Sequence, residues 1–337
     1  MNIWRILKYA RIYFEWNILK TATPSYLPDE ISVEATNVCN FKCKFCPQSS
    51  PQHHELVPRT YLSPADAAKI FTALRQGGMT TEVLHWTLDG EPFMNKKFGD
   101  LCQTGIDHAF SHFYFATNGM LLSDENIRKL PRVADTIYTF TIDFCANSAY
   151  FESVRGTQGS WQTVKNNIQR ILSANDANHL RIEIQDISSY DITDSAELQA
   201  RFQDLQTLFV DPEKRLKIYH KTFHNAAGTV AKTESGAGDK NKYHICPYPW
   251  TSLFVASNGD VVACCRDLRR QTVLGNILQQ PLTEIWRGAA FQDIRRKLAS
   301  GRPDLIEGCA SCDLPYDGSK FSVANVLRVL RGRLQVI

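Results

Sequence analysis

The chain has 337 residues, a net charge of +3 and 43% hydrophobic residues, which is typical of one large globular domain or two. This charge is too small to indicate binding to nucleic acid. No apolar run of about 20 residues could span a membrane, and charges interrupt the N-terminal apolar stretch where a signal peptide would need none. Ten cysteines in ligand-like spacings favour metal binding in a reducing cytoplasm over disulfides.

Residues 1–28 are predicted to contain an amphipathic helix that ends before Pro24 and Pro28. Arg5, Lys8 and Arg11 lie on one side of the helical wheel. The apolar residues recur at helical spacing elsewhere on it: Ile3, Ile6, Leu7, Ala10, Phe14 and Ile18. Two interpretations stay open, because such a helix either covers part of the main domain or rests on an anionic membrane or a partner.

Residues 29–220 alternate between strand and helix patterns. Helices are predicted from Ser63-Pro64 to Gly77, from about Ser123, around Val164 to Leu172, and around Leu198 to Phe209. Strands are predicted at 31–34, 83–88, 113–117, 136–142, around Ile182 and Ile184, and at 216–219. Six such units predict a parallel sheet with helices outside it. Because a closed barrel needs eight units, we expect a curved, partly open barrel.

Three cysteines, Cys39, Cys43 and Cys46, lie within eight residues directly after the first predicted strand. Thiolates are the preferred ligands of iron–sulfur clusters. Three thiolates can hold three irons of a four-iron cluster and leave the fourth iron open for chemistry, as an open ligand position does at a catalytic metal. A zinc site or ordinary reduced thiols are the alternatives that the spacing leaves open.

Special residues follow the next three strands as well. Asp89 and Gly90-Glu91-Pro92 follow the second strand, Thr117-Asn118-Gly119 follows the third, and Asp143 ends the fourth. Each of these is commonly just a turn. However, α/β barrels place their chemistry at the carboxyl ends of the strands. Four such segments in succession therefore favour a single site at this edge of the sheet.

A second group of cysteines follows a predicted linker or lid at 221–245. A hairpin with its turn at Asn258-Gly259 is predicted to bring Cys246 and Cys264 towards each other, and Cys309 and Cys312 form a two-ligand turn. Four thiols complete the ligand set of either an iron–sulfur cluster or a zinc ion. Residues 323–334 are predicted to form a basic amphipathic helix.

The C-x3-C-x2-C spacing, with Phe45 before its last cysteine, resembles the signature of the radical S-adenosylmethionine (radical SAM) superfamily. The later cysteines, with Gly259 five residues before Cys264, resemble the SPASM domain in its shortened twitch form. The resemblance implies a partial (β/α)6 TIM-like barrel at 29–220 and a small α+β domain at 246–337. It also implies one auxiliary [4Fe–4S] cluster, since no cysteine follows Cys312. Its implied ligands are Cys246, Cys264, Cys309 and Cys312, with Cys265 as a spare thiol.

The resemblance also implies a SAM site around the first cluster, which Cys39, Cys43 and Cys46 would hold. Phe45 matches the aromatic residue beside adenine, and Gly90-Glu91-Pro92 matches the motif that meets the amino group of SAM. Thr117 and Asn118 would lie near the same site, and Asp143 near the ribose and the substrate. Arg155 is a candidate for an anionic contact or an ordinary surface charge.

One residue departs from the family pattern at the end of the fourth strand. A glycine often follows the aspartate there, whereas this chain has Phe144-Cys145 after Asp143. The Cys145 thiol would lie near the substrate and either donates a hydrogen atom, as a catalytic residue, or is an ordinary buried cysteine.

The implied reaction is reductive cleavage of SAM to methionine and a 5′-deoxyadenosyl radical, which abstracts a hydrogen atom from the substrate. An external donor such as flavodoxin or ferredoxin would supply the electron, and the auxiliary cluster would pass electrons from the substrate. The first hypothesis is a small polyol, sugar or nucleoside-type substrate that undergoes dehydrogenation, epimerisation or carbon–carbon bond formation.

Two alternatives stay open. One is a peptide (RiPP) maturase of the SPASM type. The length of the segment before Cys39 argues against it, because 38 residues are too few for a separate leader-binding domain there. The other is a zinc-stapled binding protein without enzymatic activity.

Overall fold

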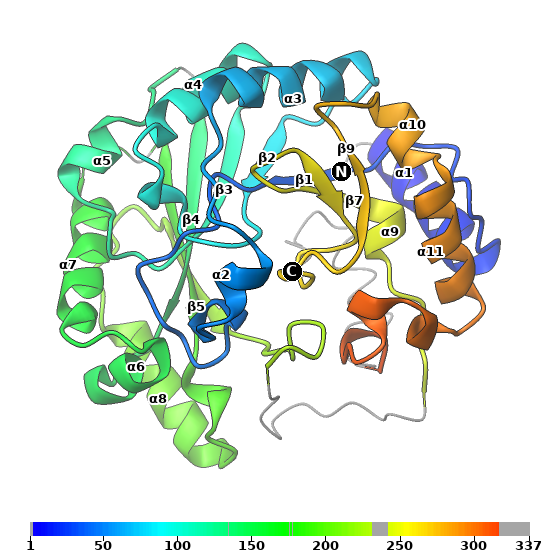
Figure 1. Cartoon of the computed structure of the whole chain (residues 1–337). Coiled ribbons are helices and arrows are strands. Elements are labelled where there is room, and N and C mark those ends of the chain that lie inside the picture. The colour runs from blue at the N-terminus through cyan, green and yellow to red at the C-terminus, as the bar shows by residue number, and fades with distance from the viewer. Residues whose placement is uncertain (1–2, 134, 175, 177, 231–241, 317–337) are drawn as a thin grey trace.

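The computed structural model describes residues 3–133, 135–174, 176, 178–230 and 242–316. One nine-stranded sheet runs through them in the order β6-β5-β4-β3-β2-β1-β7-β8-β9 (Figure 1). The first six strands are β1 Glu30–Val33, β2 Val83–Trp86, β3 His112–Thr117, β4 Ile137–Phe144, β5 Leu180–Asp186 and β6 Leu216–His220. Neighbours among them pair in parallel, which confirms the predicted (β/α)6 arrangement. Within the described residues the sheet is open, with β6 and β9 as its edges.

Helices connect these strands and form an outer layer along the sheet, as Figure 1 shows. They are α3 Pro64–Gln76, α4 Phe98–Asp107, α5 Asp124–Arg128, α6 Ser148–Arg155, α7 Ser160–Ser173 and α8 Ser195–Thr207. The predicted start of α3 is confirmed, since the Ser63 side chain accepts a hydrogen bond from the backbone N–H of Asp66 and Pro64 occupies the first turn. Helix α4 was not predicted.

The two faces of the parallel sheet differ in character because side chains alternate along each strand. The face towards the helices is apolar and buried, with Phe113, Phe115, Phe140, Ile182 and Ile184 among its residues. The opposite face is polar. Its side-by-side rows are Ser32, His85, Tyr114, Thr139 and Arg181; Thr141, Glu183 and Lys217; and Asp143, Gln185 and Tyr219. Closed barrels fill this position with branched apolar residues.

The C-terminal part extends the same sheet. β7 Ser252–Val255 pairs in parallel with β1, and β8 Asp260–Val262 and β9 Val273–Asn276 follow as antiparallel strands. The predicted hairpin is confirmed, but β9 and the pairing between β1 and β7 were not predicted. Helices α9 Tyr248–Thr251, α10 Leu282–Trp286 and α11 Ala289–Ala299 flank these strands (Figure 1).

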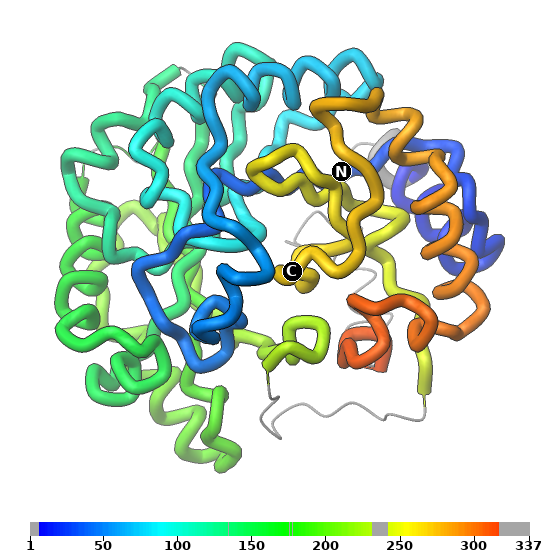
Figure 2. Tube along the Cα trace, in the orientation of Figure 1, coloured from blue at the N-terminus to red at the C-terminus, as the bar shows by residue number. Residues whose placement is uncertain are grey.

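Short elements complete the fold. The tube in Figure 2 follows the chain through them, from the N-terminal segment in blue to the last described turns in red. Helix α2 spans His53–Leu56, and single 3-10 turns span Pro47–Ser49, Pro92–Met94, Ser188–Tyr190, Pro303–Leu305, Glu307–Cys309 and Leu314–Tyr316. The predicted helix at 323–334 and residues 231–241 of the predicted linker lie outside the described residues. The predicted boundaries at 28, 220 and 245 stay predictions.

The predicted N-terminal helix is confirmed as α1 Ile3–Tyr13, which continues as a π-helical turn, Phe14–Ile18. The segment after this helix is attached to the C-terminal part by hydrogen bonds from two tryptophan side chains to its backbone carbonyl groups. The Trp250 indole donates to Thr21 at 2.7 Å, and the Trp286 indole donates to Tyr26 at 2.9 Å. Among the residues that the structure describes, none forms a helix long and apolar enough to cross a membrane.

A glycine lets α6 end directly against the first cysteine loop. Gly156 has a φ of +66°, and a Cβ atom there would lie 2.1 Å from the carbonyl oxygen of Lys42. The loop is in turn hydrogen-bonded to the end of the helix, from Lys42 N to Arg155 O at 3.3 Å and from Lys44 N to Val154 O at 2.9 Å. Only glycine fits both this conformation and this approach.

We expect Gly156→Ala to lower the free energy of unfolding by about 3 kcal/mol, since it adds a steric clash to left-handed strain. Gly159→Ala is the matched control. Its φ is +69°, but its Cβ would meet nothing within 4 Å, so strain alone should cost about 1 kcal/mol. Urea unfolding of both variants measures the difference, and equal losses would contradict the close approach.

Candidate active site

The first cysteine loop, residues 39–46, follows β1 and is partly buried, with Lys42 and Lys44 exposed. Cys39 Sγ accepts hydrogen bonds from Phe41 N at 3.4 Å and from the Asn118 side chain at 3.8 Å. Burial, together with the nearby Glu91 and Cys43, raises the pKa of the Cys39 thiol to about 12. Burial also raises the pKa of Cys46, and the nearby thiols of Cys43 and Cys39 raise it further. The structure therefore brings the three thiols within electrostatic range of one another.

The donor set of this loop bears on which metal group it fits. The only side chains of residues 39–46 that bind metals well are the three thiols of Cys39, Cys43 and Cys46. Structural zinc sites take four protein ligands. A four-iron cluster takes one thiolate per iron. Three thiols on one loop therefore fit a cluster that keeps one iron open.

Glu91 joins the loops that follow β1, β2 and β3. Its carboxylate accepts hydrogen bonds from Thr117 Oγ1 at 2.8 Å and from Asn118 N at 2.6 Å. The Asn118 amide in turn donates to Asn40 in the cysteine loop at 2.7 Å. Glu91 is only 1% exposed, and burial raises its pKa to about 7 against these donors. The structure thus brings together three segments that the sequence predicted to meet.

The glycine and proline on either side of Glu91 set its position. Gly90 has a φ of +76°, and a Cβ there would lie 2.1 Å from the backbone oxygen of Thr36. Glu91 N donates to Val38 O at 2.9 Å, and Pro92 begins a 3-10 turn. The loop that follows β2 therefore lies in close contact with Thr36 and Val38, which lead into the cysteine loop.

Asp143 and Arg155 form a buried ion pair beside the thiols. Arg155 Nη1 lies 2.9 Å from Asp143 Oδ2, and the Lys221 ammonium lies 2.8 Å from Asp143 Oδ1. Arg155 is 5% exposed, and the thiols of Cys43 and its two neighbours act with Asp143 to raise its pKa against the opposing effect of burial. The alternative that Arg155 is an ordinary surface charge is therefore wrong. Lys221 was missed, although it directly follows β6 at the edge where the other residues lie.

Phe45 belongs to an aromatic group that lies against these charges. Its ring centroid lies 5.1 Å from that of Phe223 and 5.8 Å from that of Tyr190. The Arg155 guanidinium and the Lys221 ammonium lie 5.7 Å and 5.6 Å from the Phe45 centroid. Phe223 and Tyr190 were not predicted, because they come from loops far from the cysteine motif.

Cys145 lies apart from this group. Its thiol donates to Asn147 O at 3.5 Å and is 1% exposed. Burial and the nearby Asp186 raise its pKa to about 12. None of its described hydrogen bonds is to Asp143 or to the cysteine loop, so these contacts match an ordinary buried cysteine. The catalytic role of Cys145 stays a prediction.

Asp89, which the sequence analysis placed among the special residues after the second strand, forms a second buried hub whose partners were not predicted. It accepts hydrogen bonds from the Gln48 amide and from Gly90 N at 3.0 Å, and its other oxygen lies 2.8 Å from His53 Nε2. Gln48 and His53 are 3% and 0% exposed. Asp89 ties the end of the cysteine loop to α2, and its charge adds to the raised pKa of Cys46. No periodicity in the sequence marks His53.

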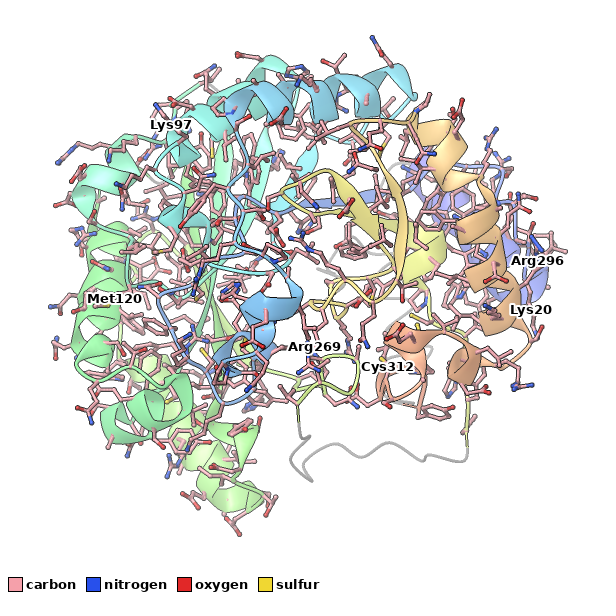
Figure 3. The ribbon with its side chains drawn as sticks, in the orientation of Figure 1. Lys20, Lys97, Met120, Arg269, Arg296 and Cys312 are labelled. Carbon is pink, nitrogen blue, oxygen red and sulfur yellow. The ribbon has the colours of Figure 1, made fainter. Side chains whose placement is uncertain are left out.

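The four later cysteines also come together. Burial raises the pKa of Cys264, and Cys265, Cys312, Cys246 and Cys309 add to the effect. Cys312, labelled in Figure 3, lies beside Arg266, whose guanidinium is 2.7 Å from Asp313. Burial raises the pKa of Cys265 to about 11, and Arg266, Glu30 and Tyr248 are among the groups that act on it. Because Cys246, Cys309 and Cys312 all act on the pKa of Cys264, its position agrees with Cys264 as the expected ligand.

A buried ion pair connects the two cysteine-bearing regions. Glu34, directly after β1, is 1% exposed and accepts from Arg270 Nη2 at 2.8 Å and from Ser257 Oγ at 2.7 Å. Arg270 lies on the loop after Cys264 and has a φ of +53°. A buried carboxylate is costly unless it is paired, so this contact favours a fixed arrangement of the two regions.

We expect Asp89→Ala to lower the free energy of unfolding by about 3 kcal/mol, because it leaves His53 and Gln48 buried without their acceptor. Asp100→Ala is the control, since that side chain is 62% exposed and makes only a long surface pair with Lys97; it should stay within about 0.5 kcal/mol of the parent. Urea unfolding provides the comparison. Equal stabilities would show that the hub contributes nothing.

Two family models match the chain. Residues 33–180 match the radical SAM superfamily, and residues 246–313 match SPASM, an iron–sulfur cluster-binding domain. The sporulation killing factor maturation protein SkfB of Bacillus subtilis (strain 168) is 25% identical over 318 residues, which cover 87% of this chain and 73% of SkfB. The S-adenosyl-L-methionine-dependent 2-deoxy-scyllo-inosamine dehydrogenase of Niallia circulans is 29% identical over 68 residues, 20% of this chain and 27% of that enzyme.

Solved structures share the fold. BtrN in complex with AdoMet and 2-DOIA superposes with a TM-score of 0.58 at 17% identity, covering 86% of this chain and 94% of BtrN. Streptococcus suis SuiB bound to S-adenosylmethionine gives a TM-score of 0.53 at 16% identity, covering 86% of this chain and 72% of SuiB. Both similarities agree with the mostly parallel α/β sheet described above. The chain therefore belongs to the radical SAM superfamily, carries a C-terminal SPASM domain, and is an enzyme that uses [4Fe–4S] clusters and S-adenosylmethionine.

Proposed function

We propose that this enzyme abstracts a hydrogen atom from a small, polar, hydroxyl-bearing molecule of the polyol, sugar or nucleoside type. Cys39, Cys43 and Cys46 would hold the SAM-binding cluster, and Cys246, Cys264, Cys309 and Cys312 one auxiliary cluster. When bound, these groups supply the one-electron cleavage of SAM to methionine and a 5′-deoxyadenosyl radical, and a route for electrons from the substrate. The family assignment overturns the alternative of a zinc-stapled protein without enzymatic activity.

The chain's own residues would bind and orient SAM. The buried Glu91 carboxylate is fixed by Thr117 and Asn118 and would accept hydrogen bonds from an ammonium group. The Arg155 guanidinium, held at 2.9 Å by Asp143, would attract a carboxylate. Phe45, which is only partly buried, would lie beside the purine ring. The aromatic group of Phe45, Tyr190 and Phe223 would also exclude water from the reacting atoms.

The choice of substrate class rests on the polar face of the sheet. Gln185 donates to Tyr219 OH at 3.3 Å and accepts from Lys221 at 2.8 Å. Tyr219 OH donates to Glu183 at 3.3 Å. Donors and acceptors thus alternate over β5 and β6 and lead up to Asp143. A site built to hydrogen-bond hydroxyl groups discriminates strongly against analogues that lack them, which suits a polyol or sugar.

One comparison favours a peptide substrate instead. The similarity to SkfB, a maturation protein by its name, extends over 318 residues, whereas the similarity to 2-deoxy-scyllo-inosamine dehydrogenase extends over only 68. A peptide maturase is therefore the second candidate function. The polar face would then receive the side chain of a modified residue.

The proposal includes an external one-electron donor such as flavodoxin or ferredoxin. It also places the enzyme in the cytoplasm, because all ten cysteines are free thiols and such thiols persist in a reducing compartment.

Cys43→Ala should abolish 5′-deoxyadenosine formation under anaerobic conditions with SAM and dithionite, because it removes one of three cluster ligands. Cys309→Ala should retain 5′-deoxyadenosine formation without substrate and lose about half of the iron-linked absorbance. Cys102→Ala is the control, since Cys102 is a buried core thiol outside both groups. Chromatography of the nucleoside and visible absorbance measure the outcomes. Full activity of the Cys43 variant would refute the assignment.

Deuterium transfer distinguishes the two substrate classes. Deuterium from perdeuterated polyols or sugars should appear in 5′-deoxyadenosine, and Gln185→Ala should reduce this transfer at least about tenfold while SAM cleavage continues. Gln103→Ala, on the exposed side of α4, is the control. Mass spectrometry of 5′-deoxyadenosine gives the readout. Transfer from deuterated peptides alone would replace this proposal with the peptide maturase.

A further inference from the structure

The N-terminal helix has apolar side chains on its solvent side. Five of the eleven exposed large hydrophobic residues in the described part of the chain lie between positions 7 and 19. They are Leu7 (53% exposed), Tyr13 (36%), Phe14 (50%), Ile18 (57%) and Leu19 (58%). We call these five residues the apolar stripe. Exposed apolar residues are normal singly, but such a concentration marks a binding surface.

Polar contacts hold this helix against the protein. Arg11 Nε pairs with Glu15 at 3.0 Å, and Glu15 accepts from Ser25 N at 2.7 Å. Lys8 pairs with Asp29. Ile12, at 5% exposed, faces the protein. The helix thus buries only part of its apolar surface, through Ile12 and part of Trp16, whereas an ordinary surface helix turns its apolar side inward.

The segment that receives these contacts is itself fixed. Besides the two tryptophan indoles, Arg295 Nη1 donates to Ala22 O at 3.0 Å. Arg295 is fully buried and also donates to Pro249 O and Trp286 O. Because the anchor belongs to the core of the C-terminal part, the apolar stripe cannot turn inward without breaking these bonds.

Several basic side chains remain accessible around the apolar stripe. The side chains of Lys8 and Arg11 are 46% and 59% exposed even though they are paired, whereas their partners Asp29 and Glu15 are only 22% and 12% exposed. Lys20 follows the stripe and is exposed. Figure 3 shows Lys20 and Arg296, on the neighbouring α11, pointing outward at the same edge of the molecule. An anionic surface would complement this edge.

We propose that the apolar stripe docks the enzyme on the surface of an anionic lipid bilayer, with its apolar side chains among the lipids and Lys8, Arg11, Lys20 and Arg296 against the headgroups. Phenylalanine, leucine and isoleucine flanked by basic residues on one helix are the features of an interfacial helix. Basic residues add attraction to anionic leaflets. The proposed contact is a peripheral one. This inference does not depend on the proposed substrate.

Flotation of the full-length holoenzyme with vesicles tests the proposal. Vesicles of phosphatidylcholine with about 30% phosphatidylglycerol should bind the enzyme at least about tenfold more tightly than phosphatidylcholine alone. The triple variant Leu7→Ser, Phe14→Ser and Ile18→Ser should lose at least about tenfold in binding. Lys20→Glu with Arg296→Glu should weaken binding to the anionic vesicles only.

The matched control replaces exposed apolar residues elsewhere, as Val133→Ser, Val210→Ser and Val273→Ser, which are 46%, 71% and 46% exposed. This variant should bind as the parent does. All variants should unfold at the parent's temperature, because the changed side chains are exposed. Absence of binding to anionic vesicles, or unchanged binding of the stripe variant, would overturn the proposal. So would a dimer in sedimentation equilibrium that the stripe variant abolishes, since the stripe would then cover a second copy.

Discussion

The buried carboxylate of Glu91 is the constraint on which the site depends. It accepts hydrogen bonds from Thr117 and Asn118, while its own backbone N–H bonds to Val38. Three loops that follow three neighbouring strands therefore meet at one side chain. Parallel strands place their carboxyl ends at one edge, and this hub fixes the loops at contact distance. Burial disfavours the charged form of this carboxylate and raises the pKa of Glu91 to about 7. An ammonium partner would favour the charged form.

The second group of thiols is positioned by the same strand that leads to the first. β1 pairs with β2 on one side and with β7 on the other, so one strand carries both regions. Glu34 at its end pairs with Arg270, on the loop that follows Cys264. Because the two contacts act on the same short segment, the separation of the two proposed clusters is fixed by the sheet itself. An electron route through the protein needs such a fixed separation.

Local patterns were sufficient to predict the six parallel strands and α3. The strands carry runs of Val, Ile, Phe and Leu, and the Ser63-Pro64 pair marks the start of α3. Helix α4 escaped prediction because Gly99 and Gly105 lower its helix propensity. Both glycines are needed for packing, since a Cβ at Gly99 would lie 2.5 Å from the Lys129 oxygen and one at Gly105 would lie 2.8 Å from the Phe113 ring. Such tertiary reasons are invisible in a sequence.

At the candidate site, too, local patterns were predictable from the sequence and long-range contacts were not. Motif spacing identified the segments that meet at Glu91 and the thiols that gather in each group. It missed three contacts, because each joins positions far apart in the chain: His53 with Asp89, Lys221 with Asp143, and Arg270 with Glu34. The pairing of β1 with β7 was missed for the same reason. Long-range contacts of this kind leave no periodicity in either segment.

Two separate thiol groups would each hold a four-iron cluster in this enzyme. Mössbauer spectroscopy of ⁵⁷Fe-labelled protein, purified and reconstituted without air, can count and distinguish these clusters. We expect about eight irons per chain in two [4Fe–4S] environments, one of which changes its spectrum when SAM is added because one of its irons is open to a ligand. About four irons per chain, or two environments that both ignore SAM, would contradict this assignment.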